Sequence, residues 1–373
     1  MTLLSKLTLV IPTYNRQPYA LRNMRYWSGS AVTVHVLDGS AQPIPTEEMA
    51  DLGANVNYHH WPIPLLDRFA RAVALVKTEY AALLGDDEFL LPDGLQACIR
   101  EMEIDETLVS CMGRCLGFGS VGAAIIGWPV HTEMAHYAVL QDDPVDRMTY
   151  HMNPYVHSTN HSVVRSPVWT QAIAIIAQRQ FSVYASGEIE FELAVCYHGK
   201  SKVIEDLMLF RSSENDGIKD EHDIVEFHEW WADKNRAHDR EEFLKLMANA
   251  LADGDAGKLE WIRQGVKAAC DRYCEFAVGD AYRRGFRAVL AKIGNRLPPV
   301  LKAAVKAPVV RILVSLPGGQ PYTRLLRKPL VQAAKELEAV GVRVDMDQLS
   351  HISKLIEQFH VVAANQTIVK VAQ

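Results

Sequence analysis

Three adjacent acids, Asp86, Asp87 and Glu88, are the residues of this sequence best suited to chemistry. They come shortly after the apolar run Tyr80–Leu84, which predicts a buried strand. Adjacent carboxylates repel one another, and a hard divalent cation relieves that repulsion because it prefers oxygen ligands. The pattern therefore predicts a magnesium-type site on Asp87 and Asp86. The alternative is a solvated loop whose acids favour the N-terminus of a helix that starts near Pro92.

A second group of acids opens a predicted helix in Ser186–Leu193. Glu188 and Glu192 are four residues apart and share one face of that helix, while Glu190 points elsewhere. One of these glutamates could reach a cleft as a general base and take the proton of a reacting hydroxyl. The alternative is that first-turn acids only complement the helix dipole.

Two more polar loops follow predicted strands. The acid Asp38, in an Asp-Gly-Ser turn, follows the apolar run Val32–Leu37, and such an acid could accept hydrogen bonds from a nucleoside. An Asp-Gly turn with no ligand is its ordinary alternative. The other loop follows Leu7–Ile11 and consists of Pro12, Thr13, Tyr14, Asn15 and Arg16.

The hydrophobic pattern predicts the elements that hold these loops. Apolar, β-branched runs predict four strands, at Leu7–Ile11, Val32–Leu37, Asn55–His59 and Tyr80–Leu84. An i, i+3, i+4, i+7 stripe from Leu66 to Lys77 predicts a helix between the last two. Strands alternating with helices predict an α/β fold with a mainly parallel sheet flanked by helices. The carboxyl ends of such strands meet at one edge, so the polar loops should converge there.

The middle of the chain is less regular. Short strands and loops are expected over Leu108–Val164, with Gly117–Gly122 as a glycine-rich turn. Two helices are expected at Pro167–Gln178 and Glu188–Tyr197, followed by two strands and a turn within Val203–Arg211.

From about Asp220 the pattern is helical, which predicts one domain at 1–216 and an all-α region at 217–373. Between Lys258 and Leu330 there are fifteen Lys and Arg against four Asp and Glu, although the whole chain has a net charge of −6. Such a basic segment suggests an anionic partner. Lys302–Leu316 could lie on an anionic membrane surface, or it could belong to a packed helical cap or a homodimer interface.

Composition limits the class of protein. The 373 residues are 49% hydrophobic and 23% charged, which is typical of a globular chain. No apolar run reaches the ~18 residues of a membrane span, and the N-terminus reads as a strand rather than a signal peptide. The negative net charge argues against a nucleic-acid partner. We therefore expect a cytoplasmic protein, with the membrane's inner face as a possible peripheral location.

Taken in order, five segments resemble family 2 glycosyltransferases of the GT-A fold, over about the first 215 residues. The segments are Leu9–Arg16, Asp38–Ser40, Thr78–Pro92, Gly187–Leu193 and His198–Arg211. The family's metal-binding Asp-x-Asp motif falls on the Thr78–Pro92 segment, and its first Asp aligns with Gly85. The family's late acidic motif, which carries the catalytic base, falls on Gly187–Leu193.

The resemblance implies an inverting transfer of a sugar from a nucleotide-sugar donor, with Mn²⁺ or Mg²⁺ as the cofactor. Asp87 and Asp86 would hold the metal. Glu190 would be the base, with Glu188 as the alternative. The Pro12–Arg16 loop, Asp38 and Asp86 would bind the nucleotide.

The implied partners are a UDP-sugar donor and a glycan or lipid-linked acceptor, as in polysaccharide biosynthesis. Two other functions stay open. One is a nucleotidyltransferase on a related fold, although the glycine-rich basic phosphate loop of such enzymes is not found at the start of this chain. The other is a non-catalytic nucleotide-sugar-binding or scaffold protein.

Overall fold

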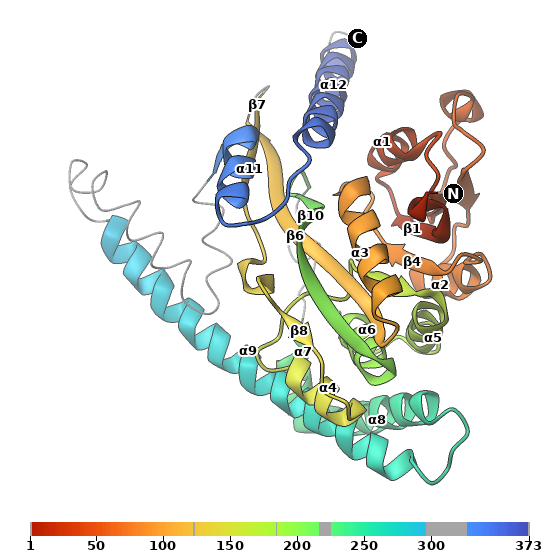
Figure 1. Cartoon of the computed structure of the whole chain (residues 1–373), viewed down its shortest axis with the longest axis vertical. Coiled ribbons are helices and arrows are strands. Elements are labelled where there is room, and N and C mark those ends of the chain that lie inside the picture. Colours follow the sequence, from red (N-terminus) through yellow and green to blue (C-terminus); the bar gives the residue numbers. More distant parts are fainter. Residues whose placement is uncertain (1, 122–123, 184, 216–224, 296–326, 372–373) are drawn as a thin grey trace.

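The computed structural model describes residues 2–121, 124–183, 185–215, 225–295 and 327–371. A twisted sheet crosses the centre of the molecule, and helices lie on both of its faces (Figure 1). The order along the sheet is β11-β7-β6-β9-β4-β1-β2-β3, and β10 pairs with β6. The strands are β1 Leu7–Thr13, β2 Thr33–Asp38, β3 Val56–His60, β4 Tyr80–Leu83, β5 Phe89–Leu90, β6 Leu108–Val121, β7 Ala124–Pro129, β8 Ala138–Val139, β9 Val163–Arg165, β10 Lys200–Ser212 and β11 Lys328–Pro329.

The central strands β3, β2, β1 and β4 are parallel, and so are β6 and β10. The short strand β9 runs antiparallel between β4 and β6, and β7 runs antiparallel to β6. The predicted α/β fold, with a mainly parallel sheet flanked by helices and a helical C-terminal region, is confirmed. Because β1, β2 and β4 are parallel neighbours, the loops that follow them share one edge.

Several helices begin at a proline, which has no backbone N–H to leave unpaired at that position. This holds for α1, α3, α4 and α5, where a proline is the first or second residue. The helices are α1 Gln17–Trp27, α2 Leu65–Val73, α3 Pro92–Ile104, α4 Pro144–His151, α5 Ser166–Ile176, α6 Ser186–His198, α7 Phe227–Ala232, α8 Ala237–Ala252, α9 Leu259–Asn295, α11 Leu330–Ala339 and α12 Met346–Val371.

Strand β1 shows how the sheet divides the core. Alternate side chains of a strand point to opposite faces. Leu9 and Ile11 pack with α1 and α3, whereas Val10 packs with α2, α5 and α6, and all three are fully buried. Both faces of the sheet are therefore apolar, which leaves its edge as the place for polar residues.

Two predictions for the middle of the chain are wrong. Gly117 does not open a turn but lies inside the fourteen-residue strand β6, where a Cβ would come within 2.6 Å of the Trp128 ring on β7. The glycine is there to let a large ring pack on the strand. Val203–Arg211 is not a strand pair but part of the single strand β10, whose register on β6 shifts near Leu207. The register shift between Val203 and Leu207 spans Glu205 and Asp206, two acids that interrupt the apolar pattern of the strand.

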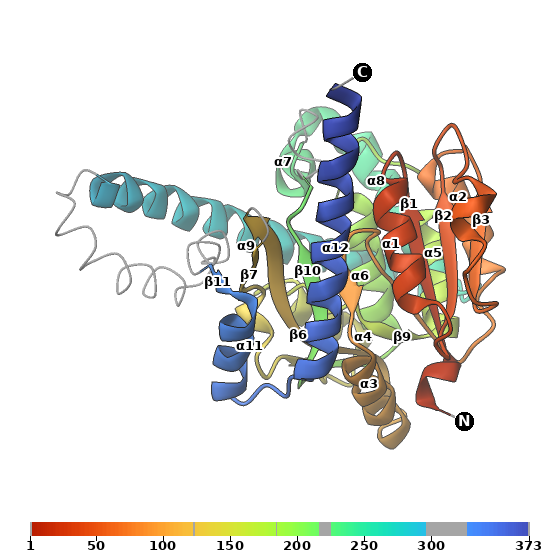
Figure 2. The ribbon, with the colours of Figure 1, turned by 90° about the horizontal axis from the view of Figure 1, so that it is seen from above.

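The C-terminal helices pack in two places. Helices α7, α8 and α9 share a core with α4, α5 and α6, in which Phe227, Trp230 and Phe243 are buried. Helices α11 and α12 pack on β6 and β10, and α12 stands beside α1 (Figure 2). The predicted boundary at 216–217 and all of Lys302–Leu316 lie outside the described residues. No described helix is long and apolar enough to cross a bilayer.

Candidate functional site

Asp38 is fully buried at the end of β2 and is held by three donors. Gln17 Nε2 and Tyr58 Oη donate to its Oδ2, each at 2.6 Å, and the backbone N–H of Ser40 donates to Oδ1 at 2.8 Å. Burial alone would raise the pKa of Asp38, but the hydrogen bonds from Gln17, Ser40 and Tyr58 outweigh it and hold the pKa below its ordinary value. This carboxylate is therefore a fixed, ionised acceptor.

The loop after β1 joins the loop after β2. Pro12 and Thr13 are the last residues of β1, and the carbonyl of Thr13 accepts from the backbone N–H of Gly39 at 3.0 Å. Asn15 has a left-handed backbone, with φ 55°, and its N–H donates to Ser40 Oγ at 2.9 Å. Tyr14 is 61% exposed at the turn, which makes it an aromatic surface available to a ligand.

The acid loop after β4 is buried, so the expectation of a solvated loop is wrong. Asp86 is 2% and Asp87 is 8% exposed. Thr13 Oγ1 donates to Asp86 at 2.7 Å, and the Arg16 guanidinium contacts both carboxylates. Asn215 Nδ2 donates to Asp87 at 2.7 Å. Burial raises the pKa of Asp86, and the Arg16 hydrogen bond opposes that rise.

Glu88 completes the acidic cluster. Its side chain is nearly buried, 3.6 Å from Arg211 and 3.7 Å from His161. Burial raises the pKa of Glu88 to about 7, against the opposing charge of Arg211. A Cβ on Gly85 would lie 3.0 Å from Glu88 Oε2. An aspartate at position 85 would therefore crowd a second acid against this carboxylate, and the glycine avoids that contact.

Three buried side chains that hold the loops were not identified from the sequence as site residues. Asn23 Nδ2 donates to the carbonyls of Asp86 and Glu88 at 3.0 and 2.7 Å. Arg22 donates to the carbonyl of Asp87 at 2.9 Å. Each lies on the buried side of α1, where the sequence signal was a polar residue at an apolar position.

Arg68 on α2 is the third of these side chains. Its Nη1 donates to the carbonyls of Thr13 and Leu37, at 2.7 and 2.6 Å, and so joins the ends of β1 and β2. A Cβ on Gly39 would lie 2.6 Å from the Arg68 guanidinium carbon, which explains the glycine after Asp38.

The acid pair suits a divalent cation by its chemistry. Magnesium takes one or two protein carboxylates together with substrate phosphate oxygens. Asp86 and Asp87 supply two carboxylates at the strand edge, but all four of their oxygens now accept hydrogen bonds from Thr13, Arg16 or Asn215. A cation would therefore have to displace Arg16. Among the described residues there is no group of three or more metal-ligating side chains.

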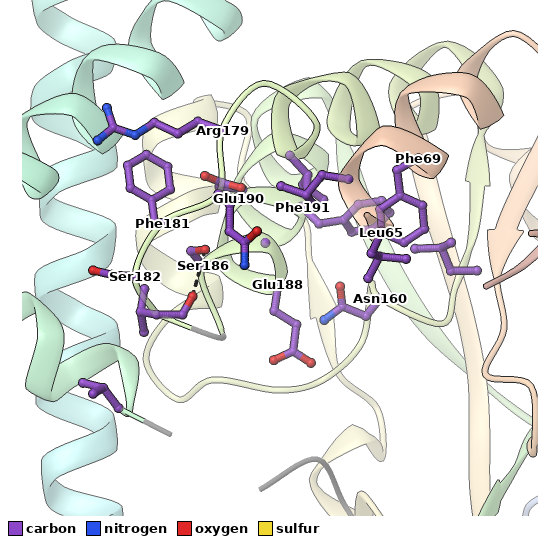
Figure 3. A pocket seen from close by; sticks show the side chains of 17 residues that line it. Leu65, Phe69, Asn160, Arg179, Phe181, Ser182, Ser186, Glu188, Glu190 and Phe191 are labelled. Atoms are coloured by element: carbon purple, nitrogen blue, oxygen red, sulfur yellow. Dashed lines mark hydrogen bonds between the residues drawn. The ribbon is translucent and has the colours of Figure 1, made fainter. Parts of the chain in front are cut away.

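A cavity of about 640 Å³ lies between α2, the end of β4 and the segment that leads into α6. Glu188 and Glu190 both line it, together with apolar side chains (Figure 3). Glu188 points downward from α6 in this view, with Asn160 to its side, whereas Glu190 lies on the side of Arg179 and Phe181. The apolar side chains are Leu65, Leu66, Phe69, Leu83, Ile176, Phe181, Val183, Phe191 and Val225.

The three glutamates of α6 differ in their surroundings. Glu188 is exposed. Glu190 is 1% exposed, its Oε1 has no hydrogen-bond partner in the described structure, and burial raises its pKa well above the ordinary value. Glu192 is fully buried and accepts from His151 Nε2 at 2.5 Å and from Thr159. Glu192 is thus a core acid and Glu188 is the accessible one.

The cavity and the acid loop are neighbours. Leu83 lines the cavity and ends β4, three residues before Asp86. Asn160 also lines the cavity, and the next residue, His161, contacts Glu88. The structure thus brings the loops after β1, β2 and β4 together and sets the predicted base helix beside them.

No family model and no curated protein matches this chain. Among solved structures, the chain is similar to S. aureus TarS 1-349, at 12% identity over 76% of this chain and 92% of that one, with a TM-score of 0.42. The same TarS fragment in complex with UDP-GlcNAc is 13% identical over 76% of this chain and 92% of that one, with a TM-score of 0.44. S. aureus TarS is 11% identical over 74% of this chain and 54% of that one, with a TM-score of 0.41. At such low similarity, the residues of the site must carry the functional argument.

Proposed function

We propose that this protein is an inverting glycosyltransferase of the GT-A type, which moves a sugar from a nucleotide diphosphate to an acceptor hydroxyl. One observation carries the proposal. A fixed carboxylate, Asp38, and the acid pair Asp86 and Asp87 share one strand edge, beside a cavity that holds the accessible Glu188. Sugar transfer needs a carboxylate that binds the nucleoside, a site for the diphosphate and a base for the acceptor hydroxyl, and these residues could supply all three.

The donor would bind across the loops after β1, β2 and β4. Asp38 would accept hydrogen bonds from the base or ribose once Gln17 or Tyr58 turns away from its Oδ2, and Tyr14 offers an exposed ring. Arg16, whose side chain is 36% exposed, can turn from the acids to the diphosphate. These loops are already joined by hydrogen bonds, which lowers the entropic cost of aligning the donor.

A divalent cation, Mn²⁺ or Mg²⁺, would be held by Asp87 and Asp86. When bound, it would stabilise the negative charge of the leaving diphosphate. Arg16 neutralises the same two acids when no cation is bound, so the site exchanges one positive charge for another.

Glu188 is the better candidate for the base. It is exposed and lines the same cavity as Asn160, and the next residue, His161, contacts Glu88 of the acid loop. Its charge raises the pKa of His157, although burial makes that pKa low overall, about 4. Glu190 lies on the side of Arg179 and Phe181, and burial raises its pKa well above the ordinary value. Glu188 would take the acceptor's proton as its oxygen attacks the anomeric carbon from the face opposite the diphosphate.

The lining of the cavity favours a glycan or lipid-linked acceptor that is uncharged and partly apolar where it enters the cavity. Its walls are mostly aliphatic and aromatic, and two acids line it. The cation at its rim, Arg179, is paired with Asp239 and Glu242 at 3.3 and 3.2 Å, so it is not free to bind an anion. A cytoplasmic location, a membrane-surface role for the basic segment and a homodimer stay predictions.

A donor screen tests the proposal. The full chain is incubated with Mn²⁺ and a panel of UDP-, GDP- and dTDP-sugars, and nucleotide release is measured with and without alkyl glycoside acceptors. We expect one nucleotide class to be released, faster with acceptor. No release and no nucleotide binding by calorimetry across the panel would contradict the proposal. Binding without release would favour a non-catalytic nucleotide-sugar-binding protein.

A further inference from the structure

The C-terminal helix α12 reaches the acid loop through a chain of hydrogen bonds that passes through a buried ion pair. His360 Nε2 on α12 donates to Glu214 Oε1 at 2.5 Å. Glu214 in turn accepts two hydrogen bonds from Arg22, at 3.1 and 2.7 Å. Arg22 also donates to the carbonyl of Asp87 at 2.9 Å. Three hydrogen-bonded steps therefore join residue 360 to residue 87.

A second path starts at the same carboxylate. Asn215 follows Glu214 directly, and its Nδ2 donates to Asp87 Oδ2 at 2.7 Å. Fixing the Glu214 side chain therefore fixes the backbone that carries Asn215. Both the carbonyl and the carboxylate of Asp87 depend on this one buried acid.

The ion pair is deeply buried. The side chain of Glu214 is 0% exposed and that of Arg22 is 2% exposed. The guanidinium lies between the rings of Tyr19, Phe89 and Phe359, 4.6–5.0 Å from their centres. Removing two charges from water is costly, and well-packed apolar residues often stabilise a core equally well. Stability alone is therefore a weak reason for this pair, whereas positioning Asp87 gives it a function.

We propose that His360 and Glu214 are positioning residues for Asp87, so that α12 completes the donor site. The expected effect on nucleotide binding rests on the proposed function. The coupling between α12 and Asp87 does not, because it follows from the hydrogen bonds alone. Without the His360 hydrogen bond, Glu214 Oε1 would keep only its bond from Arg22 Nη1, and the carboxylate would be held less firmly. Arg22 and Asn215 would then hold Asp87 less firmly.

The experiment uses the full chain with His360→Ala, His360→Gln and, as the control, Lys354→Ala. Lys354 is an exposed residue of the same helix. Affinity for UDP is measured by calorimetry with Mn²⁺, and amide exchange is followed in the peptide that contains residues 85–90. We expect His360→Ala to weaken UDP binding three- to tenfold and to speed exchange of that peptide. His360→Gln should largely restore both, because its amide N–H can still donate to Glu214.

The two proposals fail in different ways. Unchanged exchange at 85–90 in a folded His360→Ala variant would overturn the coupling, whatever the nucleotide affinity. Faster exchange together with no UDP binding in the wild-type chain would support the coupling and count against the proposed donor. An equal effect of Lys354→Ala would also overturn the proposal, because the effect would then be general to α12.

Discussion

The acid loop and the base helix α6 carry the same kind of residue in opposite settings. At the acid loop every oxygen of Asp86 and Asp87 accepts a hydrogen bond, and a cation, Arg16, contacts both. On α6 the Glu190 carboxyl is buried with an unpartnered oxygen, and Glu188 faces an apolar cavity. One region is built to hold charge in place, and the other to keep a carboxyl close to apolar surface.

We infer from this difference that the acid loop serves to bind the donor, whereas α6 supplies the group that takes a proton. A satisfied, charge-paired carboxylate keeps its geometry and attracts polar ligands. On α6, burial raises the pKa of Glu190, whereas Glu188 is exposed and can reach a substrate. The following predictions test this division, from the largest expected effect to the smallest.

Glu188→Gln should remove the base and lower kcat by about 10²–10⁴, with little change in donor affinity. Steady-state nucleotide release with saturating donor and acceptor measures it. Glu190→Gln is the matched control: Glu190 is buried and burial raises its pKa, so a neutral amide there should change activity little. The opposite ranking would place the base at Glu190.

Asp87→Ala should lower donor affinity by at least about tenfold in Mn²⁺ and leave chelator-treated samples unchanged, because one of two metal ligands is lost. Calorimetry with UDP-sugars in Mn²⁺ and in EDTA measures it. Asp93→Ala, in the first turn of α3, is the control for loss of an acid nearby. If wild-type affinity is the same in both buffers, Arg16 and not a metal supplies the positive charge.

The raised pKa of Glu88 makes stability depend on pH. Its folded pKa of about 7 exceeds the unfolded value of 4.5, so the folded state binds the proton more tightly. The contribution of Glu88 to the free energy of unfolding is therefore full below about pH 4.5 and is lost as the pH rises toward 7.

Glu88→Gln should remove this dependence, so that the difference in unfolding free energy between variant and wild type grows by up to about 3 kcal/mol from pH 4.5 to 8. Urea titrations at several pH values measure it. A difference that does not vary with pH would show that folding does not shift the pKa of Glu88.

Leu65→Ala should raise the KM for an alkyl glycoside acceptor by about three- to fivefold. Leu65 lines the cavity and is 42% exposed, so we expect the acceptor to bury the equivalent of about one methylene on it, which contributes about 0.8 kcal/mol. Donor affinity should not change. Val331→Ala, an exposed residue on α11, is the control. A lower KM for a phosphorylated acceptor than for the alkyl glycoside would contradict the uncharged-acceptor assignment.

The sequence by itself determined the strands and where their loops begin. Leu7–Ile11, Val32–Leu37 and Tyr80–Leu84 are apolar runs that stop at polar residues, and the structure ends β1, β2 and β4 within two residues of those positions. Hydrophobic periodicity is a local property, so it can be read from neighbouring residues. The meeting of Asp38 and Asp86 at one edge follows from parallel order alone.

Only the tertiary structure decided which partners surround the acids. Arg22, Asn215 and His360 lie far from Asp87 in the sequence, yet they fix it through hydrogen bonds. Burial likewise distinguishes Glu188 from Glu190, which the local sequence leaves equivalent. Hydrogen bonds between distant segments and loss of solvent arise when elements pack, and no spacing along the chain records them.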